Sequence, residues 1–313
     1  MPKEKKDFRI VFMGTPEFAV PSLDILVKND FNISAVVTAP DKPAGRGLHL
    51  HESAVKKYAT EKNLFVLQPE KLKSPDFIES LNALQPDLMV VVAFRMLPEI
   101  IWSMPAVGTF NLHASLLPQY RGAAPINWAI MNGEKETGLT TFFLEHEIDT
   151  GAIILQEKIS IGENETAGEL HDRMKIEGAN LVLKTVNLIL NEEYKLTPQV
   201  AVQPVYSAPK IFSEQCEINW AKSYSEIQNH IRGLSPYPGA FTTLNGKMLK
   251  VFKSKKSDVE NFQIQKSEPG KAESDGKTFL RFHCADFPID LLEIQLEGKK
   301  RMNVQEFLRG NKI

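Results

Sequence analysis

The segment from Asp87 to Ala93 constrains the fold most, because it contains the uninterrupted apolar run Leu-Met-Val-Val-Val. A strand that is apolar on both faces must be covered on both faces, as in a parallel sheet flanked by helices. Other apolar segments, such as 8–13 and 33–38, alternate with helical segments such as 18–28. This alternation predicts an α/β fold, with a Rossmann-like, mostly parallel sheet over residues 1–190.

The chain changes character after residue 190. Prolines at positions 198, 204 and 209, with few helical signals around them, predict an extended linker over 191–210. Beyond it, residues 218–234 suggest one helix, and Asn245-Gly246 between two apolar segments predicts a β-hairpin. Residues 211–313 are therefore expected to form a small β-barrel of the oligonucleotide-binding (OB) type.

Composition narrows the class of protein further. The chain has 313 residues, enough for two domains, and its net charge of −2 requires that any nucleic acid be held by local basic patches. It has no apolar run of about 18 residues and no signal-peptide core, so we expect a cytoplasmic protein. Cys216 and Cys284 stand far apart without a CxxC pattern, which favours structural thiols over a disulfide framework or zinc site.

Two polar residues stand at the end of another predicted strand, 107–112. Asn111 and His113 are two positions apart, so both point to one face at the carboxyl end of the strand. An imidazole can move a proton, an amide can donate to a developing oxyanion, and Asp149 could orient the imidazole. No serine or cysteine nucleophile accompanies them, which favours direct transfer to an external nucleophile. The structural alternative is a core histidine beside a turn-capping asparagine, and spacing alone does not decide between the two.

Basic residues appear in two further places. Arg46 lies between Gly45 and Gly47 in the loop 41–49, where a mobile arginine suits a phosphate or the end of a nucleic acid. Lysines of the C-terminal region, including Lys247 and Lys250, could contact an RNA backbone. From the residues alone, an ordinary solvated loop is the slightly favoured interpretation of 41–49, and lysines like those of the C-terminal region usually mark a solvated surface. Four aromatic residues of this region favour core or rim packing over base stacking, namely Trp220, Tyr224, Tyr237 and Phe241.

These motifs resemble those of the methionyl-tRNA formyltransferase family, within the superfamily of enzymes that use 10-formyltetrahydrofolate. Asn-x-His-x-Ser-Leu-Leu-Pro at 111–118 and Asp-Thr-Gly at 149–151 are similar to the superfamily motif. Pro-Ala-Gly-Arg-Gly at 43–47 is more specific to the tRNA enzymes. The resemblance extends over nearly the whole chain and includes Pro-Tyr-Pro-Gly at 236–239.

The resemblance implies formyl transfer from 10-formyltetrahydrofolate to the α-amine of methionyl-initiator tRNA, for translation initiation. It assigns catalysis to Asn111, His113 and Asp149. Contact with folate is assigned to four consecutive residues, Ser115, Leu116, Leu117 and Pro118. Contact with tRNA is assigned to four basic residues, Lys42, Arg46, Lys247 and Lys250. Because the sequence shows neither a metal site nor a transmembrane segment, we expect no protein-bound metal and no membrane contact, and we expect a monomer.

One strip departs from the family pattern. Ala93-Phe94-Arg95-Met96-Leu97-Pro98 has Arg95 where the family has a glycine after an aromatic residue, beside the folate pocket of relatives. In this strip the chain is closer to sugar-nucleotide formyltransferases, which, with folate hydrolases, are the nearest alternative enzymes. A non-catalytic RNA- or folate-binding protein is a further alternative. The loop 43–47 argues against both a sugar-nucleotide formyltransferase and a folate hydrolase. The presence of Asn111, His113 and Asp149 together argues against a non-catalytic binding protein, because binding alone does not need all three.

Overall fold

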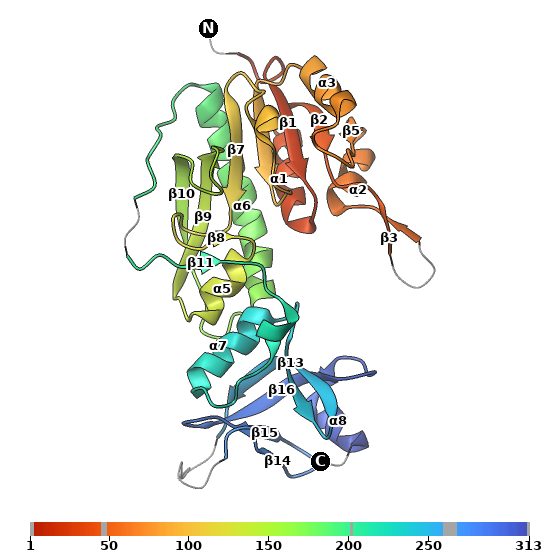
Figure 1. Cartoon of the computed structure of the whole chain (residues 1–313), viewed down its shortest axis with the longest axis vertical. Coiled ribbons are helices and arrows are strands. Elements are labelled where there is room, and N and C mark those ends of the chain that lie inside the picture. Colours follow the sequence, from red (N-terminus) through yellow and green to blue (C-terminus); the bar gives the residue numbers. More distant parts are fainter. Residues whose placement is uncertain (1–2, 45–48, 201–202, 259–267, 312–313) are drawn as a thin grey trace. The chain divides into compact units, whose positions relative to one another are not determined.

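The computed structural model describes residues 3–44, 49–200, 203–258 and 268–311, and its elements are labelled in Figure 1. The chain folds into two compact units, whose segments alternate along the sequence. The first comprises Met1–Arg121, Gly138–Ile159 and His171–Tyr206, and the second comprises Gly122–Thr137, Ser160–Leu170 and Ser207–Ile313.

The first unit is built on a seven-stranded sheet. In spatial order its strands are β10 (Ile153–Ser160), β9 (Glu136–Phe143), β7 (Gly108–His113), β6 (Leu88–Val92), β1 (Arg9–Gly14), β2 (Asn32–Val37) and β5 (Val66–Leu67). β1 is parallel to β2 and β6, and β6 is parallel to β7, whereas β9 is antiparallel to β7. Every residue of β6 is buried. The prediction of a Rossmann-like, mostly parallel sheet is thus confirmed.

Helices connect these strands, and α6 is the longest of those in the described ranges. They are η1 (Glu17–Ala19), α1 (Val20–Lys28), α2 (Ala54–Glu61), α3 (Pro75–Ala83), α4 (Glu99–Trp102), α5 (Pro125–Met131) and α6 (Ala167–Leu190), with the short strands β3 (Lys42–Ala44), β4 (His49–His51) and β8 (Arg121–Gly122) between them. A capping box begins α6, because the Thr166 hydroxyl accepts from the Glu169 amide at 3.3 Å and the Glu169 carboxylate accepts from the Thr166 amide at 2.9 Å. The helix runs along β7 and β9 (Figure 1).

The second unit contains a curled antiparallel sheet of half-barrel form, which confirms the barrel-type prediction. Its strands are β12 (Ala240–Leu244), β13 (Lys247–Lys256), β16 (Pro288–Leu296), β15 (Leu280–His283) and β14 (Ala272–Ser274), with β17 (Met302–Asn303) paired to β16. The unit also holds α5, which lies within its segment Gly122–Thr137, together with β11 (Ser207–Ala208), η2 (Ser213–Cys216), α7 (Tyr224–Leu234) and α8 (Val304–Gly310). Asn245 and Gly246 join β12 to β13 with φ angles of 50° and 76°, as a two-residue hairpin turn requires.

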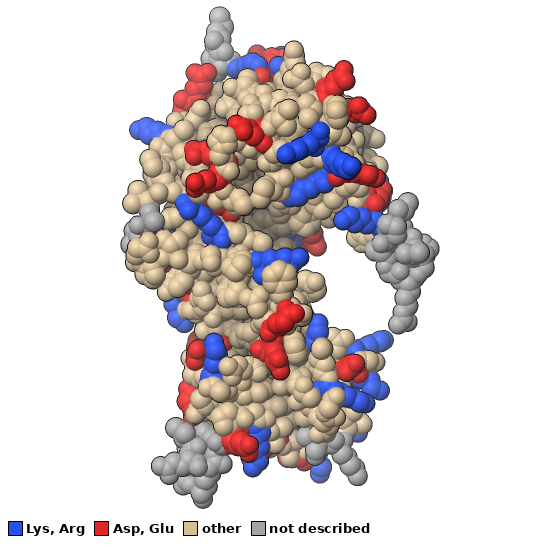
Figure 2. Space-filling model, in the orientation of Figure 1, with Lys and Arg blue, Asp and Glu red and all other residues tan. Residues whose placement is uncertain are grey.

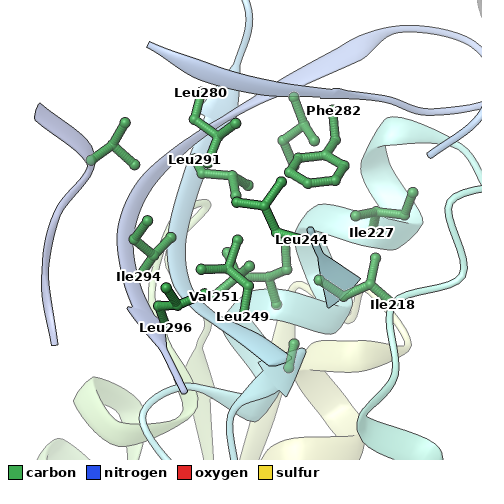
Figure 3. Close-up of a cluster of buried hydrophobic side chains, with 14 of the residues drawn as sticks. Ile218, Ile227, Leu244, Leu249, Val251, Leu280, Phe282, Leu291, Ile294 and Leu296 are labelled. Carbon is green, nitrogen blue, oxygen red and sulfur yellow. The ribbon is translucent and has the colours of Figure 1, made fainter. Parts of the chain in front are cut away.

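Apolar side chains from the sheet and α7 fill the inside of this curl. Figure 3 shows Leu249, Val251, Phe282 and Leu291 gathered there. Phe282 also stacks face to face on Trp220, with ring centroids 4.5 Å apart. Cys216 and Cys284 are buried in the same core. Burial, with the nearby Asp286 charge, raises the pKa of the Cys284 thiol to about 12, so this thiol stays neutral at physiological pH.

The helix expected over 218–234 begins later, at Tyr224, so that prediction was wrong at its start. The Ile218 amide donates to the Phe241 carbonyl at 2.8 Å, which holds the preceding segment extended against β12. Ser223 then caps α7, in a capping box with Glu226. Tertiary pairing therefore overrides the apolar periodicity of 218–223.

No helix in the part of the chain that the structure describes is long and apolar enough to span a membrane.

The packing of Phe282 predicts a large effect of its removal. Phe282→Ala should lower the free energy of unfolding by about 3–5 kcal/mol, because a buried aromatic ring is lost and Trp220 loses its stacking partner. Leu292→Ala on β16, where the leucine is 40% exposed, is the control and should cost less than about 1 kcal/mol. Urea denaturation of both variants measures the difference, and equal losses would contradict this account of the core.

Candidate active site

Strand β7 places two of the predicted catalytic residues on one face of the sheet. Asn111 lies opposite Val91 on β6 and Phe142 on β9, and His113 ends the strand. Leu112, between them, points to the opposite face, as the alternation of a strand requires. The structure therefore places Asn111 and His113 at the carboxyl end of a parallel strand, the edge at which ligands bind in open α/β sheets.

A backbone carbonyl and a carboxylate fix the surroundings of the His113 ring, which is 7% exposed. Nε2 lies 2.9 Å from the Tyr120 carbonyl oxygen, and Nδ1 lies 3.9 Å from Asp149 Oδ2. A carbonyl only accepts, so Nε2 carries a hydrogen and donates it. The Asp149 contact is longer than a hydrogen bond, so this carboxylate acts on Nδ1 as a nearby charge. Nδ1 is the ring nitrogen available to exchange a proton with a substrate.

Tyr120 is a site residue that the sequence did not reveal, because it contributes a backbone atom. The chain after β7 turns back, with the Ser115 hydroxyl donating to the Gln119 carbonyl at 2.5 Å. Tyr120 has a left-handed φ of 58°, its amide donates to the Tyr206 carbonyl at 2.7 Å, and the two rings stack. These contacts hold the Tyr120 carbonyl against His113. No pattern of residue types signals such a partner.

Asn111 differs from its neighbours in its hydrogen bonding. Its side chain is half-buried, and no residue in the described ranges forms a hydrogen bond with its amide group. An amide held on a rigid strand without a protein partner can donate to an oxygen atom of a bound substrate.

Asp149 reaches the site from the connection between β9 and β10. Its backbone is left-handed, with φ of 56°, and its carbonyl accepts a hydrogen bond from Gln199. Two residues later Gly151 packs so tightly that a Cβ atom would stand 1.7 Å from the Phe143 carbonyl oxygen. Only glycine fits there, and this close approach sets the course of the turn that carries Asp149.

The predicted folate segment, 115–118, leaves the sheet beside these residues. Ser115 and Leu117 are buried, and three of their backbone polar groups have partners within the protein. The Thr140 hydroxyl donates to the Ser115 carbonyl and accepts from the Leu117 amide, and Gln156 donates to the Leu117 carbonyl. The other two residues of the segment are half-buried. A ligand would therefore contact the segment through Leu116 and Pro118, and the folate contact itself stays a prediction.

In the strip 93–98, which departs from the family pattern, Arg95 is exposed. Its guanidinium donates to the Glu70 carbonyl at 2.9 Å and to the Pro69 carbonyl, and lies over the Phe94 ring. These bonds direct the Arg95 charge to a neighbouring turn of the first unit.

The predicted tRNA-contacting residues differ in accessibility. Lys42 on β3 and Lys247 at the start of β13 are exposed. Lys250 is half-buried, and its ammonium group donates to the Pro238 carbonyl at 2.9 Å. Arg46 lies outside the described residues. None of these contacts with tRNA is tested by the structure, and they stay predictions.

Tyr237 is not packed as expected for the aromatic residues of the second unit. It is 82% exposed, on the turn whose Pro238 carbonyl Lys250 binds. Trp220, by contrast, is stacked on Phe282 and donates to the Thr242 hydroxyl, and Tyr224 and Phe241 pack against the core.

Comparison with known proteins identifies the class to which this chain belongs. The chain matches the model of the formyl transferase family over residues 8–186, and the model of the formyl transferase C-terminal domain over 210–312. It is similar in fold to a sugar 3N-formyl transferase, WlaRD, crystallised with 5-N-Formyl-THF. That structure has a TM-score of 0.68 and 24% identity, over 94% of this chain and 99% of the other.

Two curated relatives are much closer in sequence. The methionyl-tRNA formyltransferase of Azobacteroides pseudotrichonymphae is 52% identical, over 97% of this chain and 96% of its own length. That of Bacteroides thetaiotaomicron is 48% identical, over 99% of this chain and 98% of its own length. The chain therefore belongs to the methionyl-tRNA formyltransferase family.

The packing at Gly151 predicts the effect of adding a single methyl group. Gly151→Ala should lower the free energy of unfolding by about 3 kcal/mol, because the Cβ atom would overlap the Phe143 carbonyl and force the turn to move. Gly310→Ala is the matched control and should stay within about 0.5 kcal/mol of the parent, since in the described part of the chain no atom outside its own helix backbone and chain neighbours lies within 4 Å of a Cβ atom there. Urea denaturation measures both, and a neutral Gly151→Ala would refute the described turn.

Proposed function

We propose that this protein transfers a formyl group from 10-formyltetrahydrofolate to the α-amine of methionine carried by initiator tRNA, a step of translation initiation. The observation that carries the proposal is the identity of 52% and 48%, over nearly the full chain, to proteins named for this activity. The cluster of Asn111, His113 and Asp149 supplies the chemistry that the reaction needs.

The acceptor in this reaction is a neutral amine. A free α-amino group has a pKa of about 7.7–8.0, and an ester on its own carboxyl group lowers it, so the neutral form is present near pH 7. The amine nitrogen attacks the formyl carbon, negative charge grows on the formyl oxygen, and the amine loses a proton. The bond from the formyl carbon to the donor nitrogen then breaks, and that nitrogen takes up a proton as it leaves. Asn111 would donate to that oxygen through its unbonded amide group. One such donor typically contributes about 3–4 kcal/mol to transition-state stabilisation.

His113 would act through Nδ1, because the Nε2 hydrogen is already directed at the Tyr120 carbonyl. Nδ1 would donate to the formyl oxygen or exchange the proton lost by the amine. The Asp149 carboxylate, 3.9 Å away, would balance the charge that develops on the ring and accept the amine proton, directly or through a water molecule. In this proposal the two side chains act as a pair.

The formyl donor would lie against segment 115–118. When bound, 10-formyltetrahydrofolate supplies a formyl group attached to a nitrogen that can leave. The half-buried apolar side chains of Leu116 and Pro118 suit a flat ring system, and the Asn111 amide suits its polar substituent. The family membership of the chain supports the same donor class.

The tRNA would be held by Lys42, Arg46, Lys247 and Lys250, by attraction of basic side chains to phosphates. Figure 2 shows basic and acidic side chains interspersed over much of one face, with several Lys and Arg side chains gathered on one side of the second unit. Such local patches fit a chain of net charge −2 that binds RNA. The domain division at 1–190, 191–210 and 211–313, the monomeric state and the cytoplasmic location remain predictions.

Incubation with formyl donor and charged initiator tRNA tests the proposal, with formylmethionine as the expected product. A sugar-nucleotide amine serves as the competing acceptor, because Arg95 stands where sugar-nucleotide enzymes differ from the tRNA enzymes. Product from the sugar amine, and none from the charged tRNA, would replace the proposed function by that alternative.

The catalytic assignment predicts a loss of turnover without a loss of donor binding. His113→Ala and Asp149→Ala should each lower kcat by about 100-fold or more, since a proton-transfer group contributes about 10²–10⁴-fold. The Kd for the folate donor should change much less, because neither side chain belongs to segment 115–118. Steady-state kinetics and titration of donor binding measure the two effects. Unchanged turnover in both variants would exclude the assignment.

The position of Arg46 between two glycines predicts an effect on substrate choice. Arg46→Ala should mainly weaken discrimination between initiator and elongator tRNAs, as the loss of a contact with the acceptor end would do. The ratio of kcat/KM for the two charged tRNAs measures it. Arg46→Lys retains the charge but not the two-pronged guanidinium, so it separates attraction from recognition. A wild-type ratio in Arg46→Ala would count against this contact.

A further inference from the structure

Gln199 is turned inward from a surface segment. Residues 195–198 and 200 are exposed, whereas Gln199 is half-buried. Its side-chain carboxamide contacts two other segments of the first unit, the turn that carries Asp149 and the segment that begins at Tyr120. These are the two segments that flank the His113 ring.

The carboxamide uses its full capacity for hydrogen bonds in these contacts. Nε2 donates to the carbonyl oxygens of Asp149 and Gly151, each at 2.9 Å. Oε1 accepts from Arg121, at 2.6 Å from Nη2 and 3.2 Å from Nε. A carboxamide has two N–H donors and one oxygen with two lone pairs, so all positions are occupied. Because carbonyls only accept and a guanidinium only donates, the orientation of the amide is fixed by its partners.

These hydrogen bonds of Gln199 reach the chain segments on both sides of the His113 imidazole. Arg121 directly follows Tyr120, whose carbonyl binds His113 Nε2, while Asp149 faces Nδ1. Asp149 has a left-handed φ of 56°, a conformation that few residues with a side chain adopt, although Asp adopts it more readily than most. Gln199 donates two hydrogen bonds to this turn and joins it to Arg121.

We propose that Gln199 is a positioning residue for formyl transfer. By joining the Asp149 turn to Arg121, it sets the position of the Asp149 carboxylate relative to His113 Nδ1. The inference rests on the proposed function, since it assumes that Asp149 and His113 act in the reaction.

Two substitutions of Gln199 distinguish its bonds to the Asp149 turn from its bonds to Arg121. Gln199→Met keeps the length of the side chain and removes every hydrogen bond, whereas Gln199→Glu can still accept from Arg121 but cannot donate to the two carbonyls. We expect both to lower kcat by about 10- to 100-fold with KM changed less than about threefold, because a small displacement of a catalytic group is costly. Gln295→Met is the matched control and should keep the wild-type kcat, since among the described residues the Gln295 amide bonds a surface carbonyl alone, that of Lys299.

A double substitution distinguishes positioning from general stabilisation. If Gln199 acts through the Asp149 carboxylate, Gln199→Met should add little to the loss already caused by Asp149→Asn. An independent, additive loss in that background would overturn the proposal, as would a wild-type kcat in Gln199→Glu. Should Gln199→Met fail to fold, Gln199→Glu carries the same comparison, because it can retain the Arg121 contact.

Hydrogen exchange gives a readout that does not depend on activity. Amide exchange over residues 145–152 should become faster in Gln199→Glu and stay unchanged in Gln295→Met. Unchanged exchange in both would overturn the positioning role whatever the enzyme catalyses. If the wild-type protein formylates no charged tRNA while exchange responds as expected, the proposed function fails and the link between Gln199 and the turn stands.

Discussion

The antiparallel register of β9 on β7 determines how the site can be assembled. Thr140 stands opposite His113, and Phe143 stands opposite Phe110, so β9 ends far from the end of β7 that carries His113. The connection to β10 must therefore return along the sheet before Asp149 can lie 3.9 Å from the imidazole. The left-handed backbone of Asp149 and the tight packing of Gly151 follow from that return. The same register brings the Thr140 hydroxyl to the Ser115 carbonyl and the Leu117 amide, which fixes the chain where it leaves β7.

Much of the fold could be predicted because its strongest signals are local. The buried run of β6, the capping box of α6 and the Asn245-Gly246 hairpin each specify their element through nearby residues. The start of α7 could not be predicted in the same way. Residues 218–223 carry a pattern that fits a helix, but the bond from Ile218 to the Phe241 carbonyl holds them extended. That bond depends on where β12 lies, and propensity within one segment contains no such information.

The same distinction applies to the site. The period of a strand is enough to put Asn111 and His113 on one face, and the family motif adds Asp149. Tyr120 and Gln199 escaped sequence reasoning for different reasons. Tyr120 contributes a carbonyl oxygen, which every residue has, so its identity carries no signal. Gln199 lies in a segment interpreted as a linker, some fifty residues after the turn whose carbonyls it binds. Only the folded chain shows that Gln199 bonds the turn that carries Asp149.

Several polar side chains around the site form hydrogen bonds within the protein, whereas the Asn111 amide bonds no described residue. This difference suits a transfer reaction. Thr140, Gln156 and Gln199 all bond within the protein, and such bonds hold groups in one geometry before a substrate arrives. In the described part of the chain the Asn111 amide has no such bond, although its backbone lies in the centre of a rigid sheet. A half-buried amide can bond water in the free protein, so leaving it unpaired costs little stability. In the proposed reaction it would exchange water for the formyl oxygen without breaking any bond that holds the fold, and the imidazole beside it would exchange a proton while Tyr120 keeps the ring in place.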